Sequence, residues 1–288
     1  MLDDFKFDGS RKLRLNAIAS GAGSEAREQK AELVQKTEEN IAEACALQEK
    51  LYADRREALV IALQARDAAG KDSLIKKVFS GLNPAALEVH AFKAPSATEL
   101  AHDYMWRINA ALPARGKIAV FNRSHYEDVL AVKVHHLEKT YRLAPRCLTE
   151  DFFERRYRQL KDWETYLYEN GIRMVKVLLN VSAEVQKERF MDRMELDEKH
   201  WKLSVSDMKE RALWKEYDEA YEAMVNGTAT PESPWYVLPA DHKWYTRYLM
   251  SELLVRTLRE MGPEYPALSP EEAAAVPQLI EELSRESK

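Results

Sequence analysis

The chain has 288 residues, 45% of them hydrophobic, and its 9 glycines and 11 prolines argue against a low-complexity or fibrous protein. Lys and Arg total 43 against 48 Asp and Glu, which gives a net charge of −5. The chain therefore lacks the basic excess that is typical of non-specific nucleic-acid binders. Any polyanionic ligand would need a local cluster of basic side chains. The first residues are polar and acidic, and no apolar run approaches the roughly 18 residues that a membrane span needs. Cys45 and Cys147 form no metal or disulfide pattern. We therefore predict a cytoplasmic protein with no nucleic-acid and no membrane partner.

The first 54 residues are a predicted N-terminal arm followed by a helical segment. Residues 1–23 have weak periodicity and several Gly and Ser, which indicates an extended arm. Residues 24–54 are charged and favour helix, and their apolar side chains recur at helical steps, which predicts an amphipathic helix that can contain an interruption. Two roles stay open for this helix: packing on the domain that follows, or forming an interface with another subunit.

Short apolar runs alternate with helical patterns through the middle of the chain. The runs lie at 58–65, 87–92, 117–121, 174–181 and 235–239, and the helical patterns at 71–80, 97–111, 124–138, 149–170 and 183–195. This order predicts an α/β domain over residues 55–265, with a mostly parallel five-stranded sheet flanked by helices. Such sheets bind ligands at the carboxyl ends of their strands. Residues 266–288 are predicted to be a polar C-terminal helical tail.

The first apolar run leads directly into the loop 66–73 (RDAAGKDS) and then a helical pattern. Strand, tight loop, Gly-Lys and helix together are the context of a phosphate-binding loop, in which backbone N–H groups and Lys71 collect phosphate oxygens. The remaining candidate phosphate-binding residues of this loop are Ala68, Ala69, Gly70, Asp72 and Ser73. The alternative is a simple βα turn in which Gly70 is structural and the charges are exposed.

This loop departs from the usual GxxxxGK[ST] pattern in two places. Ala65 stands where the first Gly would be, and Asp72 stands where the Mg²⁺-binding hydroxyl would be. Asp67 can compensate, because a carboxylate in the loop can hold Mg²⁺ with phosphate oxygens completing the octahedron. Ser73, one residue late, is a weaker candidate for the same task.

A second acidic cluster follows the run at 117–121. Glu127 and Asp128 are candidate carboxylates near the metal, since P-loop enzymes place such a group at the end of another core strand. Arg123 could neutralise phosphate charge there. The alternative is a capping box formed by Ser124 and Glu127, and both roles can hold together.

Basic side chains cluster in the predicted helix 183–195 and in the loop after it. Arg189 and Arg193 lie four residues apart and so share one helix face, which is typical of a lid that closes over phosphates; we place this lid at about 183–215. A solvated face paired with neighbouring acids is the alternative. Further candidate phosphate contacts are Lys93, Arg107, Lys199 and Lys202. A weaker track for a longer phosphate chain adds Lys76, Lys77, Lys209 and Arg211.

Six ordered segments together resemble polyphosphate kinase family 2 over roughly residues 45–265. They are QARDAAGK at 64–71, FKAPS at 92–96, FNRSHYEDVL at 121–130, ERFMDR at 188–193, KHWKL at 199–203 and WYVLPAD at 235–241. The resemblance implies a thymidylate-kinase-like P-loop fold and Mg²⁺-dependent phosphoryl transfer between inorganic polyphosphate and the nucleotides AMP, ADP and ATP, with guanine nucleotides as further candidates. It also implies a homo-oligomer, either a dimer or a tetramer.

The resemblance assigns roles residue by residue. Asp67 would hold Mg²⁺ or the phosphate acceptor, and Lys71 would bind phosphate. Asn122, Arg123 and Asp128 would belong to the Walker-B-like segment, with Asp67 and Asp128 as the metal ligands, and Arg189 and Arg193 would act from the lid. Glu127 looks like the class III type that accepts both AMP and ADP, whereas other members tend to carry Asn there.

Two other functions remain open from the sequence. An ordinary ATP-dependent nucleotide kinase would use the same loop, with ATP as the donor. A non-catalytic module that binds a phosphate ligand is the second alternative, because Asp72 replaces the usual hydroxyl.

Overall fold

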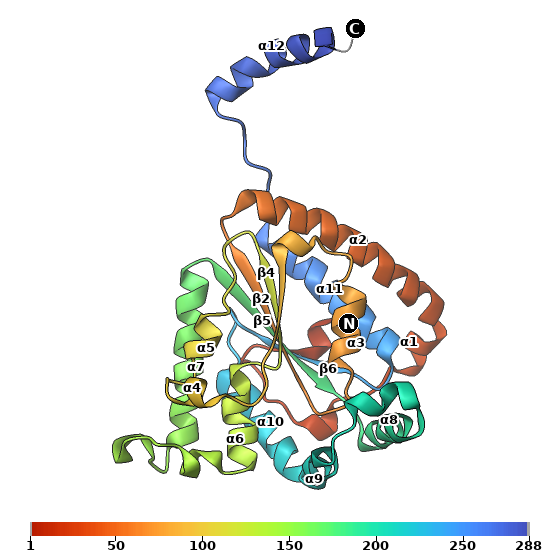
Figure 1. Cartoon of the computed structure of the whole chain (residues 1–288). Helices are drawn as coiled ribbons and strands as arrows, with labels where there is room; N and C mark the ends of the chain where they lie inside the picture. The colour runs from red at the N-terminus through yellow and green to blue at the C-terminus, as the bar shows by residue number, and fades with distance from the viewer. Residues whose placement is uncertain (1, 287–288) are drawn as a thin grey trace.

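The computed structural model describes residues 2–286, in which a twisted sheet is covered by helices on both faces (Figure 1). The strands are β1 (Lys6–Phe7), β2 (Ala58–Ala65), β3 (Leu87–Ala91), β4 (Ile118–Asn122), β5 (Ile172–Asn180) and β6 (Trp235–Pro239). They form one six-stranded sheet in the order β1-β6-β5-β2-β4-β3. Every pair is parallel except β1 with β6. The predicted α/β class and mostly parallel sheet are therefore confirmed.

The prediction of five strands was one short. The additional strand, β1, lies in the arm that we expected to be extended, and it pairs with only two residues of β6. A two-residue strand contains too few side chains to produce an alternating pattern, so its pairing is decided by contact with β6 rather than by local sequence.

The helices fall into two layers and one group at the carboxyl edge of the sheet. One face carries α1 (Ser24–Glu28), α2 (Lys30–Asp54), α3 (Lys71–Val78) and α11 (Lys243–Met261). The other carries α4 (Ala97–Leu100), α5 (Trp106–Asn109), α6 (Ala131–Val134), α7 (Phe152–Glu169) and α10 (Trp214–Thr228). The remaining helices are α8 (Ala183–Glu195), α9 (Ser206–Ala212) and α12 (Pro270–Glu286).

The central strands are apolar on both faces because helices cover both. In β2, Leu59, Ile61 and Leu63 join the core that lies under α2, α3 and α11, while Val60 joins the core on the other side. A strand buried on both sides has no polar face, which explains the unbroken run ALVIALQA. The predicted helix over 24–54 is present with its interruption at Gln29, and α2 packs along α11.

Two predicted helices are broken in the structure. Within 97–111, the Asp103 carboxylate accepts a hydrogen bond from the Met105 N–H, and this turn separates α4 from α5. Within 124–138, the chain forms a 3-10 helix, His125–Val129, and then the single turn α6. The expected capping box is absent there, because the Ser124 hydroxyl accepts from the Tyr126 N–H and the Glu127 carboxylate faces Arg123.

The carboxyl ends of the strands gather the loops that the sequence singled out. Leu63 of β2 is in register with Asn122 of β4, and Ala65 with Leu179 of β5, so the loops that follow these strands emerge together. Helices α8 and α9 and the 3-10 helix Asp197–Lys202 lie at this edge. The helix α12 stands apart from the body at the end of an extended linker (Figure 1), and none of its described residues is buried. Among the described helices, none is long and apolar enough to cross a membrane.

Candidate active site

The loop after β2 turns sharply into α3 through left-handed backbone. Ala68 has φ 60° and Gly70 has φ 107°, and at Gly70 the absence of a Cβ makes this conformation accessible at little cost. Gly70 is the N-cap of α3 and forms no side-chain cap, so the first N–H groups of the helix keep their capacity to bind an anion. The local backbone therefore has the geometry that the phosphate-loop interpretation requires.

Lys71 is buried at the start of α3, with only 9% of its surface exposed. Its ammonium donates a hydrogen bond to the Ala65 carbonyl at 3.0 Å. Burial lowers the pKa of Lys71 to about 8, and the positive charge of Arg123 acts in the same direction. A phosphate oxygen at this position would supply the negative charge that the ammonium lacks.

The two residues that follow Lys71 are held by protein partners. The Asp72 carboxylate accepts a hydrogen bond from the Asn122 amide at 2.9 Å and lies 3.9 Å from the Lys202 ammonium. The Ser73 hydroxyl donates to the Gly70 carbonyl at 2.9 Å. Ser73 therefore stabilises the turn of the loop, and Asp72 connects the loop to β4 and to the predicted lid.

A large cavity opens over this loop, with about 1230 Å³ of empty space that is partly open to solvent. We call it the basic cavity, because its lining carries Lys71, Lys93, Arg123, Arg189, Arg193, Lys199, Lys202 and Lys243. Residues 67–73, Asn122 and Asp192 also line it. Nearly all of the predicted phosphate-binding residues thus surround one space, although they come from several separate segments.

The two arginines of α8 are engaged differently. The Arg189 guanidinium donates to the Ala68 and Ala69 carbonyls at 3.0 and 2.9 Å and also to the carbonyls of Ala240 and Asp241. It therefore braces the phosphate loop against the loop after β6. Arg193 instead pairs with Asp207 of α9 at 3.0 Å, which links α8 to α9 within the segment that we predicted to be a lid.

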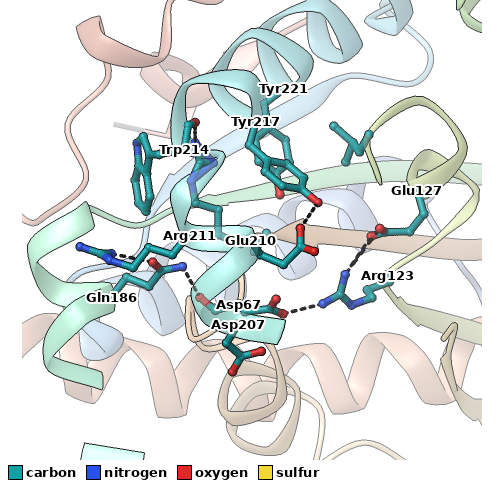
Figure 2. Close-up of a pocket in the computed structure, with 13 residues that line it drawn as sticks. Asp67, Arg123, Glu127, Gln186, Asp207, Glu210, Arg211, Trp214, Tyr217 and Tyr221 are labelled. Carbon is teal, nitrogen blue, oxygen red and sulfur yellow. Dashed lines mark hydrogen bonds and ion pairs between the residues drawn. The ribbon is translucent and has the colours of Figure 1, made fainter. Parts of the chain in front are cut away.

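Arg123 forms the centre of the site, between two carboxylates. It lies 2.5 Å from an Asp67 oxygen and 3.4 Å from a Glu127 oxygen. Its backbone is left-handed, with φ 64°, a strained conformation for a residue other than glycine. Its N–H donates to the Leu63 carbonyl of β2, and its side chain reaches Asp67 in the loop after that strand. Figure 2 shows the Arg123 guanidinium between the Asp67 and Glu127 carboxylates.

Two predicted site residues lie elsewhere. Asp128 is absent from the described lining of both cavities at this edge, and it lies in a buried region near Arg156 and Arg107. Burial raises the pKa of Asp128 to about 6, against the lowering effect of those two arginines. Arg107 donates to the Lys93 carbonyl at 2.8 Å, so it supports the loop that carries Lys93 instead of lining the basic cavity.

A second pocket adjoins the basic cavity and shares Asp67 and Arg123 with it. It has about 450 Å³ of empty space that is partly open to solvent, and we call it the aromatic pocket because Trp214, Tyr217 and Tyr221 of α10 line it (Figure 2). Arg66 lies over the Trp214 ring, 4.0 Å from its centroid. The polar lining comes from Arg66, Asp67, Arg123, Glu127, Gln186, Asp207, Glu210 and Arg211.

Most of the aromatic pocket was missed by the sequence analysis. Trp214, Tyr217 and Tyr221 are spaced three and four residues apart, which places them on one helix face, and this periodicity was the available signal. Glu210 is held by the Tyr217 hydroxyl at 2.7 Å and by the His135 ring at 2.9 Å, and its position depends on α6 and α10. Of the weaker track residues, Lys77 pairs with Glu38 of α2 and Arg211 lines the aromatic pocket.

The carboxylates of this site suit a divalent cation that also binds phosphate. Among the described residues, no three His, Cys, Asp or Glu side chains form a cluster that could hold a metal by themselves. Mg²⁺ usually takes only one or two protein carboxylates and completes its octahedron with phosphate oxygens and water. Asp67 and Glu127, on either side of Arg123, have the right chemistry for that arrangement.

Comparison with known proteins adds to this geometry. The sequence profile of the family polyphosphate kinase 2 matches residues 26–266. An ADP-polyphosphate phosphotransferase of Rhodopseudomonas palustris is 41% identical over 239 residues, which is 82% of this chain and 83% of that protein. An AMP/ADP-polyphosphate phosphotransferase of Meiothermus ruber is 40% identical over 220 residues, covering 76% and 79%. The crystal structure of polyphosphate kinase 2 from Arthrobacter aurescens TC1 superimposes with a TM-score of 0.86 at 33% identity, covering 97% and 96% of the two chains.

Proposed function

The chain belongs to the polyphosphate kinase 2 family, and we propose that it transfers phosphoryl groups from inorganic polyphosphate to both AMP and ADP with Mg²⁺ as its metal. Phosphoryl transfer between polyphosphate and nucleotides is the activity named for its relatives, and it is the activity of this enzyme. The choice of acceptor, the metal and the individual site residues are the parts that we propose.

One observation carries the proposal: two cavities of opposite character meet at Asp67 and Arg123. The basic cavity has the positive side chains and backbone N–H groups that a phosphate chain requires. The aromatic pocket has rings on which a nucleobase can stack and polar groups that can bind its edge. Polyphosphate in the basic cavity and a nucleoside in the aromatic pocket would bring their phosphates together at the shared residues.

The reaction then needs positioning and charge neutralisation more than covalent chemistry by the protein. A terminal phosphate oxygen of the acceptor attacks the terminal phosphorus of polyphosphate. The new P–O bond forms as the P–O bond to the rest of the chain breaks, and the shortened chain departs with that electron pair. Lys71 and Arg123 offset the charge that spreads over the transferring oxygens. Mg²⁺, held by Asp67 and Glu127, would supply further neutralisation when bound.

We keep Asp128 as a proposed metal ligand, but the structure supports Glu127 in this role better than Asp128. Glu127 lines the aromatic pocket beside Arg123, whereas Asp128 lies in the buried region near Arg156. A rotation of the 3-10 helix His125–Val129 on substrate binding would be needed to bring Asp128 to the metal.

The acceptor preference depends on Glu127. The two relatives described above have nearly equal identity, yet one is named for ADP and the other for AMP and ADP. Glu127 binds Arg123, and a carboxylate in this position can keep Arg123 aligned when the acceptor brings only the single phosphate of AMP. We therefore assign the chain to the type that accepts both nucleotides.

The test is a direct assay of purified protein. The protein is incubated with Mg²⁺ and polyphosphate, and with AMP or ADP in separate reactions, and all adenine nucleotides are resolved by chromatography. ATP from ADP together with ADP from AMP is the expected result. ATP from ADP alone would overturn the dual-acceptor assignment. Transfer from ATP but not from polyphosphate would show that ATP, and not polyphosphate, is the phosphoryl donor. Omission of Mg²⁺ with a chelator should abolish transfer.

The assembly and location of the enzyme belong to the same proposal. A homo-oligomer, dimer or tetramer, is supported by the exposed apolar residues Val276, Leu279 and Ile280, which recur at helical steps along α12. Sedimentation of the full chain tests this, and a monomer at micromolar concentration would contradict it. A cytoplasmic location is supported by two unpaired thiols, those of Cys45 and Cys147.

A further inference from the structure

A charged side chain lies in the middle of the sheet, where the surrounding residues are apolar. Lys176 belongs to β5, one of the central strands, and its side chain is 0% exposed. Its ammonium lies 2.6 Å from a carboxylate oxygen of Glu164, on α7, whose side chain is 1% exposed. The ammonium also donates to the Thr228 carbonyl at 2.8 Å, at the end of α10. These contacts of Lys176 therefore join a central strand to α7 and to the end of α10.

The ion pair continues toward the active site through Tyr126. The Tyr126 hydroxyl donates to the second oxygen of Glu164, and the Tyr126 ring packs edge-on against Trp235 of β6. Tyr126 is itself fully buried. The His125 ring lies beside the same carboxylate, with its Nε2 3.6 Å from a Glu164 oxygen. Tyr126 is thus anchored to Glu164, and the His125 ring packs beside the same carboxylate without a hydrogen bond to it.

This 3-10 helix carries Glu127, which lines the aromatic pocket, and directly follows the segment with Arg123, which lines both cavities. Glu127 directly follows Tyr126, and Arg123 precedes the helix in its left-handed conformation. A non-glycine residue persists in such a conformation only where its surroundings constrain it strongly. Ser124 adds one constraint, through its hydrogen bond with the Gln64 side chain of β2 at 3.0 Å. The contacts of Tyr126 with Glu164 supply another from the opposite side.

Burying an ion pair in a protein core has a large desolvation cost. Well-packed apolar side chains of similar volume often stabilise a protein as well or better, because two charges must be removed from water to form the pair. Unlike apolar packing, the hydrogen bonds of this pair require a defined geometry. Glu164 can bind Lys176 and Tyr126 at the same time only when the 3-10 helix lies in one particular position. The arrangement therefore favours precise placement over stability.

We propose that Tyr126, Glu164 and Lys176 are positioning residues that hold Glu127 in place for the nucleotide acceptor. Glu127 lines the aromatic pocket and not the basic cavity, whose phosphate loop and α8 arginines are held by other contacts. This proposal rests on our assignment of the aromatic pocket to the acceptor. None of the three residues lines either cavity. Their effect on the acceptor is therefore indirect, and it concerns affinity for AMP and ADP and not affinity for polyphosphate.

The test compares the binding of two ligands to variants that keep the fold. Tyr126→Phe removes a single hydroxyl, and Glu164→Gln keeps an acceptor for Tyr126 while removing the charge. Leu253→Ala, in α11 on the opposite face of the sheet, is the matched control, since it opens a core cavity far from this network. The Kd of AMP and the Kd of tripolyphosphate are measured separately by titration calorimetry, and thermal unfolding is recorded for every variant.

Tyr126→Phe is expected to weaken AMP binding by about tenfold and to leave the tripolyphosphate Kd within about twofold of the wild-type value. Glu164→Gln should also weaken AMP binding, and it should lower the unfolding temperature more than Tyr126→Phe, because the buried Lys176 ammonium loses its counter-charge. Leu253→Ala should lower the unfolding temperature and change neither Kd. Unchanged AMP binding in Tyr126→Phe would overturn the proposal, as would an equal loss for both ligands or a similar loss in Leu253→Ala.

Because binding is measured, the outcome is independent of catalysis. A wild-type protein that binds both ligands but transfers no phosphoryl group from polyphosphate would overturn the proposed function and leave this comparison intact. A wild-type protein that does not bind AMP would overturn the positioning proposal itself.

Discussion

The basic cavity takes much of its lining from one short stretch, residues 67–73, whereas the aromatic pocket is assembled from separate elements that include β2, α8, α9 and α10. In the basic cavity, backbone N–H groups and Lys71 follow one another along a single loop. In the aromatic pocket, the rings of α10 form a surface only because folding places Arg66, Glu127 and Glu210 next to them. Under our proposal, the site for phosphate depends mainly on a local motif, whereas the site for the nucleoside depends on how distant segments pack together.

The largest expected effect is on the basic cavity. Lys71→Ala should reduce transfer to both AMP and ADP by about three orders of magnitude, because a buried cation beside the transferring oxygens is lost. The fold should persist, since the Lys71 ammonium makes one hydrogen bond, to the Ala65 carbonyl. Initial rates and thermal unfolding are measured together. Lys76→Ala, on the same helix but outside the described lining of either cavity, is the control and should keep near-normal rates.

The next effect sharpens the contrast between the two sites. Trp214→Ala should raise the KM for AMP and ADP by about 10- to 100-fold, since stacking on an aromatic ring is worth about 1–3 kcal/mol per base. The KM for polyphosphate should not change, because Trp214 lines only the aromatic pocket. Trp106→Ala is the control, at a half-exposed ring on α5. Parallel increases in both KM values would contradict the division into two sites.

A pH effect should be confined to the basic cavity. The pKa of Lys71 is lowered to about 8 in the folded protein, so its ammonium is charged below that pH and loses its proton above it. Polyphosphate favours the charged form, so its KM should rise above pH 8 by up to about tenfold per pH unit. The KM for the nucleotide should change less over pH 7 to 9.5.

Lys71→Arg is the control for this pH effect, because a guanidinium stays charged throughout the range. If Lys71→Arg is active, its polyphosphate KM should be flat with pH. A rise identical to that of the wild type would assign the titration to another group.

The smallest expected effect concerns the boundary between the sites. Glu127→Asn should change the ratio of AMP to ADP turnover by about fivefold, the value of a partly exposed ion pair of about 1 kcal/mol. The total rate with ADP should change less, because the asparagine keeps one side-chain oxygen that can bind Mg²⁺ and Asp67 still pairs with Arg123. Competition assays with both acceptors in one mixture measure the ratio directly. A constant ratio would remove Glu127 from acceptor selection.

Much of the fold was predictable because it depends on local pattern. The strands β2 and β6 begin and end where the apolar runs do, and α8 covers the predicted residues 183–195. The failures occurred where tertiary contacts outweigh local preference. Asp103 interrupts one helical pattern through its own side chain, and Tyr126 draws the next segment into a 3-10 helix by pairing with Glu164.

The sequence by itself determined the alternation of the five longer strands with helices and the sharp turn from β2 into α3. These features depend on the period of apolar residues and on the chemistry of a few adjacent side chains. The sequence also contained a sign that was overlooked: Lys176 interrupts an otherwise apolar strand, IRMVKVLLN, and a lysine there requires a buried partner. Only the tertiary structure decided which acidic residue pairs with that lysine and which carboxylates face Arg123. It also decided that three rings of α10 lie beside the loop after β2. Those facts depend on distances between residues far apart in the chain, and such distances are set by the packing of helices on the sheet and not by any local pattern.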